Sequence, residues 1–141
     1  MNTKAFLITA FLCITALACG LAAPATPSDR CVPASAVQME NVRQGIKQVD
    51  ANNDALQGFA VQSGDHESLW FVAAPITGPG LDSLKPIGLW AMSGELDSPT
   101  AVFSVDGMAQ QFSNWSDGTQ AEPELSMSDD GAQEALSCAK Q

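Results

Sequence analysis

The sequence predicts an α+β domain: an antiparallel sheet of about four strands, an N-terminal amphipathic helix, a C-terminal helix and one disulfide linking the ends. Three observations predict it. Apolar residues recur at helical spacing early in the chain, and runs rich in aromatic and β-branched residues follow before a last helical segment. One cysteine stands near each end of this region. Helices before and after a run of strands are typical of the α+β class.

The N-terminal helix is expected within residues 33–49. Met39, Val42, Ile46 and Val49 follow one another at intervals of three, four and three residues. This spacing places all four on one side of a helix, because an α-helix makes a turn about every 3.6 residues. We therefore expect this side to pack against the sheet.

Four strands are expected after a turn-rich segment. Gly58 interrupts the first strand, and the second ends at Pro75 or just beyond it. The strands cover residues 56–62, 68–74, 87–92 and 100–105.

The second and third strands are apolar on both sides. If they pair through the Gly-Pro-Gly loop between them, the alternation of side chains separates two sets of residues. One face carries Trp70, Val72, Trp90 and Met92, and the other carries Leu69, Phe71, Ile87 and Leu89. Either helices cover both faces, or one face is exposed and meets a partner.

Polar residues predict where the later helices begin. Asp106 is expected to cap a short helix over residues 108–112, because its carboxylate accepts hydrogen bonds from the free amides of a first turn. Ser128 or Asp129 is expected to cap a last helix that runs to Ala139. The polar segment between these two helices is expected to be a loop.

The cysteines predict one disulfide. Cys13 and Cys19 belong to the apolar N-terminal segment, which leaves Cys31 and Cys138 near the two ends of the expected domain. A pair of cysteines in an oxidising compartment most simply forms a bond. Closing a loop of this length stabilises a fold by about 4.7 kcal/mol on the chain-entropy model.

Residues 1–25 are expected to be an export signal. Lys4 precedes an apolar run, residues 5–17, which matches the apolar region of a signal peptide and is too short to span a membrane. An Ala- and Pro-rich tether, residues 20–30, would then lead into a single globular domain, residues 31–141.

Two ways of processing this signal remain open. Residues 17–19 resemble a bacterial lipobox, in which case residues 1–18 are removed and Cys19 is acylated. Residues 23–25 instead fit the small-residue rule for ordinary secretion, with cleavage after Ala25. The first outcome predicts a membrane lipoprotein, and the second predicts a freely secreted protein.

The charge of the chain excludes some classes of partner. The formal net charge is −10 at pH 7, and no cluster of Lys or Arg occurs that could bind phosphates. Nucleic acid is therefore not an expected partner. Because an acidic chain is repelled by anionic lipids, membrane attachment is expected only through a lipid on Cys19.

The single histidine is a candidate for chemistry. His66 stands between Asp65 and Glu67, just before the main strand, where it could act as a base or a metal ligand. No second histidine and no nucleophile motif accompanies it. We expect no cofactor, no metal and no catalytic residue, with a small hydrolase or metal-dependent enzyme using His66 as the alternative.

Strand and turn patterns between about residues 66 and 116 carry a resemblance. The segments are 70–76 with 78–80, 87–91, and 104–109 with Phe112 and Trp115. They resemble short exported proteins of high-GC Gram-positive bacteria, a group with no established function. The resemblance implies a shared exported α+β domain and supplies no catalytic residue.

Together these observations favour an exported or surface-anchored binding protein over an enzyme. Its partner would be a protein or ligand at the cell surface, met by the Gly78–Lys85 loop or by the aromatic face of the sheet. The candidate binding residues on that face are Trp70, Trp90 and Met92.

Overall fold

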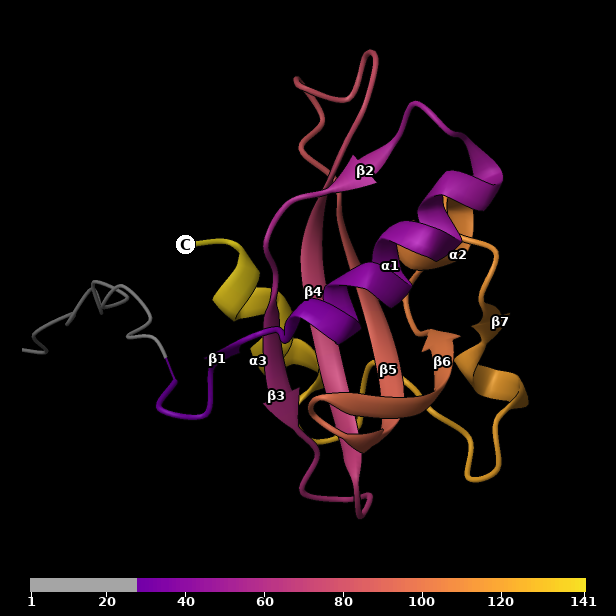
Figure 1. Ribbon diagram of the computed structural model, residues 1–141. Coiled ribbons are helices and arrows are strands. Elements are labelled where there is room, and N and C mark those ends of the chain that lie inside the picture. The colour runs from indigo at the N-terminus through magenta and orange to yellow at the C-terminus, as the bar shows by residue number, and fades with distance from the viewer. Residues whose placement is uncertain (1–27) are drawn as a thin grey trace, which may run out of the picture.

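The computed structural model describes residues 28–141, which form a sheet with helices on both faces (Figure 1). The α+β class predicted from the sequence is confirmed. The strands are β1 (Val32–Pro33), β2 (Asp54–Ala55), β3 (Phe59–Gln62), β4 (Leu69–Thr77), β5 (Ile87–Glu95), β6 (Ser98–Ser104) and β7 (Ser116–Asp117). The helices are α1 (Ala36–Val49), α2 (Gly107–Phe112) and α3 (Ala132–Ala139), with a 3₁₀ turn at Gly118–Gln120.

The sheet has seven strands and is mixed, which corrects the prediction of about four antiparallel strands. Its order is β1-β3-β4-β5-β6-β7, and β2 pairs with the far end of β4. All pairs are antiparallel except β6 with β7. The extra strands β1, β2 and β7 contain two residues each, too few to show an alternating pattern. One of them, β7, lies in the polar segment that we expected to be a loop.

The predicted pairing of the two main strands is confirmed. Trp70 lies opposite Met92 and Val72 lies opposite Trp90, so these four residues share one face of the sheet. Both strands are longer than predicted. β4 continues through Pro75 to Thr77, and β5 continues past Met92 to Glu95.

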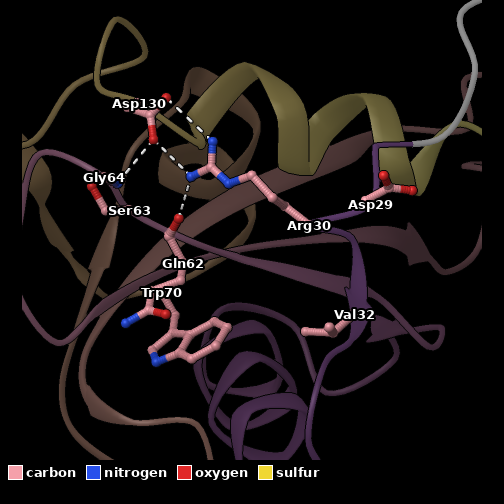
Figure 2. Close-up of a pocket in the computed structure, with 8 residues that line it drawn as sticks. All are labelled: Asp29, Arg30, Val32, Gln62, Ser63, Gly64, Trp70 and Asp130. Atoms are coloured by element: carbon pink, nitrogen blue, oxygen red, sulfur yellow. Dashed lines mark hydrogen bonds and ion pairs between the residues drawn. The ribbon is translucent and has the colours of Figure 1, made fainter.

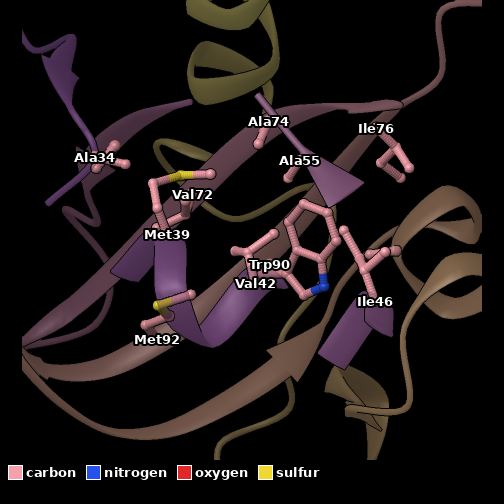
Figure 3. Packing of buried hydrophobic residues seen from close by; sticks show 12 residues of the cluster. Ala34, Met39, Val42, Ile46, Ala55, Val72, Ala74, Ile76, Trp90 and Met92 are labelled. Carbon is pink, nitrogen blue, oxygen red and sulfur yellow. The ribbon is translucent and has the colours of Figure 1, made fainter. Parts of the chain in front are cut away.

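Helices cover both faces of this sheet, which decides between the two alternatives left open by the sequence. α1 and α2 lie over one face, and α3 packs on the opposite face (Figure 1). Figure 3 shows Met39, Val42 and Ile46 of α1 packed beside Trp90 and Met92. On the other face, α3 contributes Ala132, Ala135 and Leu136 to a cluster with Phe71 and Leu89.

The first helix begins at a capping box. The backbone amide of Gln38 donates to Ser35 Oγ at 3.2 Å, and the backbone amide of Ser35 donates to the side-chain Oε1 of Gln38 at 3.0 Å. This reciprocal pair satisfies two amides that a helix start leaves free. The buried side of the helix stops at Ile46. Val49, which we expected on that side, is 50 % exposed at the last position of the helix.

The second helix begins as predicted. Asp106 Oδ1 accepts hydrogen bonds from the amides of Ala109 at 2.8 Å and Leu89 at 3.0 Å, so one carboxylate caps α2 and holds β5. Burial raises the pKa of Asp106, and the two amide hydrogen bonds oppose that shift.

The last helix begins differently from the prediction. Its N-cap is Gly131, with a φ of 93° and no side-chain hydrogen bond, so neither Ser128 nor Asp129 caps it. Glycine adopts this left-handed conformation without the steric cost that other residues meet. The Asp129 carboxylate accepts instead from the Ser126 amide at 2.9 Å and stabilises the turn before the helix.

The two ends of the domain are linked covalently. Cys31 and Cys138 form the predicted disulfide, with their Cα atoms 6.0 Å apart. Within residues 28–141, no helix has the length and apolar character needed to cross a bilayer. The expected export signal, its alternative acylated Cys19 and most of the expected tether lie outside the described residues.

Candidate functional site

Three surface pockets each contain a residue or loop that the sequence analysis named as a candidate site. The Trp70 pocket, beside β4, has a volume of about 610 Å³. The loop pocket, beside the Gly78–Lys85 loop, has a volume of about 520 Å³. The His66 pocket is smaller, at about 320 Å³. Each corresponds to one of the binding or catalytic hypotheses.

The Trp70 pocket combines an aromatic side with a charged side (Figure 2). Arg30 Nη2 lies 2.7 Å from Asp130 Oδ2, and its Nη1 lies 3.3 Å from the other oxygen of the same carboxylate. The guanidinium also donates to the backbone carbonyl of Gln62, and the Gly64 amide donates to Asp130 at 2.8 Å. These contacts join the start of the domain to the end of β3 and to the turn before α3.

The Arg30 guanidinium of this pocket is already paired. Hydrogen bonds from Arg30 and the Gly64 amide lower the pKa of Asp130. Arg30 also forms an ion pair with Glu134 at 2.9 Å, so one guanidinium serves two carboxylates. Because Arg30 bonds to Asp130 and Glu134, these contacts hold the fold together and leave Trp70 as the apolar contact surface of the pocket.

The loop pocket lies where β4 ends and β5 begins, next to the last residues of the chain. In Figure 1 the connection between these strands projects beyond the sheet near β2. The apolar wall of the loop pocket includes Leu56, Leu81 and Ile87. Leu56 is 56 % exposed, whereas Ile87 is half-buried and packs against the core cluster on the α3 face, so the wall extends from the surface toward the core.

Backbone hydrogen bonds give the loop a defined shape. The Leu81 amide donates to the Gly78 carbonyl at 3.1 Å, and the Leu81 carbonyl accepts from the Leu84 and Lys85 amides at 3.0 Å and 2.9 Å. The side chain of Asn53 packs on Gly78, where a Cβ would not fit. The pocket is therefore preformed, as small-molecule sites commonly are.

The basic side chains of residues 28–141 differ in whether they form ion pairs. Arg30 pairs with two carboxylates, while Arg43 and Lys47 both pair with Asp54, at 3.5 Å and 3.2 Å. Two basic residues remain in residues 28–141 without an ion pair. They are Lys85 and Lys140, and both line the loop pocket.

The structure brings His66 to a carboxylate. Its Nε2 lies 3.3 Å from Asp129 Oδ2, and both side chains are largely buried. The Ser126 hydroxyl donates to the other oxygen of Asp129 at 3.2 Å. The carboxylate therefore stands between the imidazole and the hydroxyl, whereas a nucleophilic triad needs the imidazole in the middle. Within residues 28–141, no three His, Cys, Asp or Glu side chains gather as a metal-binding group.

The predicted aromatic binding set changes in this fold. Trp90 and Met92 are completely buried beneath α1, because the helix covers the face on which they lie. Only Trp70 is partly exposed, at the rim of its pocket. Leu56 and Lys140, which line the loop pocket, were missed. Each is an isolated residue with no local pattern around it, and chain folding alone makes them neighbours.

Comparison of the chain with family models, with curated proteins and with solved structures finds no match.

Proposed function

We propose that this chain is an exported, non-enzymatic binding protein whose ligand occupies the loop pocket. The observation that carries the proposal is that both lysines outside the ion pairs of residues 28–141 line one preformed pocket with an apolar wall. Sites of this kind combine an apolar wall with a few charged groups that orient the ligand. The loop is one of the two surfaces that the sequence analysis proposed.

Binding is tested by NMR on ¹⁵N-labelled protein with a library of small fragments. We expect ligands to shift the amide signals of residues 78–86 and 139–141. Leu56→Gln should weaken binding, because it places an amide on the apolar wall. Leu84→Gln is the matched control: Leu84 belongs to the same loop and is 72 % exposed, but it is not among the residues that line the pocket. Shifts confined to Trp70 or His66 would contradict the proposed site.

Export is part of the proposal and rests on residues 1–25. The disulfide between Cys31 and Cys138 supports it, since such bonds persist in oxidising compartments. Intact mass is to be measured on protein from the membranes and the medium of a Gram-positive host. An acylated N-terminus at Cys19 identifies a surface lipoprotein, and a soluble chain beginning at Thr26 identifies a secreted protein. A chain retained in the cytoplasm with its N-terminus uncleaved would contradict export.

A second candidate function is hydrolysis or metal-dependent catalysis at His66. The contact of 3.3 Å between His66 and Asp129 favours it, because a carboxylate partner orients an imidazole for proton transfer. Ester, phosphate and peptide substrates are assayed with and without divalent metal ions. Turnover that His66→Gln abolishes would support this function, whereas equal rates in both proteins would reject it.

A further inference from the structure

We propose that the ligand of the loop pocket is a singly charged amphiphilic anion, an alkyl carboxylate of medium chain length. This inference rests on the proposed function, since it names the class of molecule that the same pocket binds. It follows from three properties of the pocket: the depth of its apolar wall, the position of its two lysines, and the number of charges at its rim.

The apolar wall is arranged for a tail that enters from the surface. Leu56 is largely exposed, and Ile87 is half-buried against the core cluster beneath α3. A chain of methylene groups placed along this path leaves water progressively as it approaches the core. Each methylene group that is buried raises affinity about fourfold.

The positive charge lies at the outer end of this path. Lys85 and Lys140 are both exposed, and no carboxylate lies within 4.0 Å of either ammonium group in the described chain. In a protein with a net charge of −10, cations normally find acidic partners nearby. These two remain available to an anionic head that stays in water while its tail is buried.

An acidic group near the lysines favours a ligand with a single charge. Asp82 lines the same pocket as the two lysines. Its carboxylate offsets one of the two positive charges, so a ligand with one negative charge balances the rim. A doubly charged phosphate monoester would lose the water around its second charge without gaining a cation. The pocket therefore favours a carboxylate head over a phosphate head.

Isothermal titration of the processed full chain with sodium decanoate tests the proposal. We expect one site per chain, with affinity falling about fifteenfold for octanoate because two methylene groups are removed. The double variant Lys85→Gln/Lys140→Gln should lose about tenfold in affinity for decanoate, and added salt should weaken binding to the original protein. Lys47→Gln, a lysine on α1 outside the pocket, is the matched control and should bind normally.

Neutral and doubly charged probes separate this proposal from the function on which it rests. If decanol or decyl phosphate binds in the loop pocket as tightly as decanoate, the anion class is wrong while the binding site stands. If decanoate affinity is equal in the double variant and in Lys47→Gln, the role of the lysines is overturned. If neither these probes nor any fragment shifts residues of the loop pocket, both the ligand class and the proposed function fail.

Discussion

The indole Nε1 of Trp90 donates a hydrogen bond to Ser113 Oγ at 3.0 Å, and both side chains are buried. The Ser113 hydroxyl in turn donates to the Ala109 carbonyl at 2.7 Å and lies 3.1 Å from Ser104 Oγ. A residue that closes α2 thus satisfies the polar group of the largest side chain in the core. This contact explains how a sheet tryptophan is buried completely without leaving an unpaired donor.

Ser113→Ala should therefore destabilise the fold by about 1–3 kcal/mol, because it leaves the Trp90 indole N–H buried without an acceptor. Urea unfolding followed by tryptophan fluorescence measures the loss. Ser137→Ala is the control, since the Ser137 hydroxyl is exposed on α3 and bonds only to the Gln133 carbonyl. We expect it to change stability by less than about 0.5 kcal/mol. Equal effects of the two substitutions would contradict the buried contact.

Gly45→Ala should also destabilise the protein, by about 1–3 kcal/mol, through overpacking. Gly45 lies in α1 directly beneath the indole of Trp115, where a Cβ would overlap the ring. The Trp115 Nε1 donates to the Asn41 carbonyl at 3.1 Å, which holds the ring in place. Thermal unfolding monitored by circular dichroism measures the change in stability.

Gly107→Ala supplies the comparison for that prediction. Gly107 opens α2, and a Cβ there meets no atom within 4 Å. The substitution should stabilise by about 0.4–1 kcal/mol, because alanine loses less backbone entropy on folding. A loss of stability in Gly107→Ala as large as that in Gly45→Ala would show that the Trp115 contact is not the cause.

Removal of the disulfide should cost about 2–5 kcal/mol of stability, since the bond closes a loop across almost the whole domain. The double variant Cys31→Ala/Cys138→Ala and the reduced original protein should unfold at similar urea concentrations. Intact mass before and after reduction provides the independent check, with an expected gain of two hydrogen atoms. An unchanged mass would mean that the thiols are free.

The ion pair of Arg30 with Asp130 should make stability sensitive to acid. The pKa of Asp130 is lower in the folded protein than in the unfolded chain, where it is about 4. At pH values above about 4 the charged carboxylate therefore contributes its full stabilisation. That contribution is lost as the pH falls through the lower folded-state pKa. Asp130→Asn should therefore be less stable than the original protein at pH 7, and the difference should shrink below about pH 4.

The control for this prediction is Arg30→Gln, which removes the guanidinium and keeps the carboxylate. Urea midpoints are measured at several pH values for both single variants and the double variant. In the Arg30→Gln background, Asp130→Asn should have a much smaller effect at pH 7. A difference between the original protein and Asp130→Asn that stays constant down to pH 2 would contradict the ion-pair explanation.

Much of the fold could be predicted because its causes lie within short segments. The spacing of Met39, Val42 and Ile46 is a property of one helix, and the shared face of Trp70 and Trp90 follows from the alternation of two paired strands. The cap at Asp106 is equally local. Val49 shows the limit of such patterns. It follows the apolar spacing of α1 but is exposed, because the spacing does not show where the helix extends beyond the sheet that it covers.

Contacts between distant segments account for what the patterns missed. The two-residue strands β1, β2 and β7 exist only because longer strands lie beside them. The last helix begins at Gly131, and Asp129, which was expected to cap it, instead lies 3.3 Å from His66 on a distant segment. Neither effect has a trace in the local sequence.

For function, composition and short motifs predict a small acidic α+β domain with a terminal disulfide and an N-terminal segment typical of export. The loop pocket could not be predicted in this way, because residues far apart in the sequence form it. Lys85 and Lys140 become neighbours because the end of α3 packs beside the connection between β4 and β5. Burial of Trp90 likewise depends on α1 covering its face. Exposure and proximity are properties of the packed chain, because they depend on which distant segments exclude water from one another.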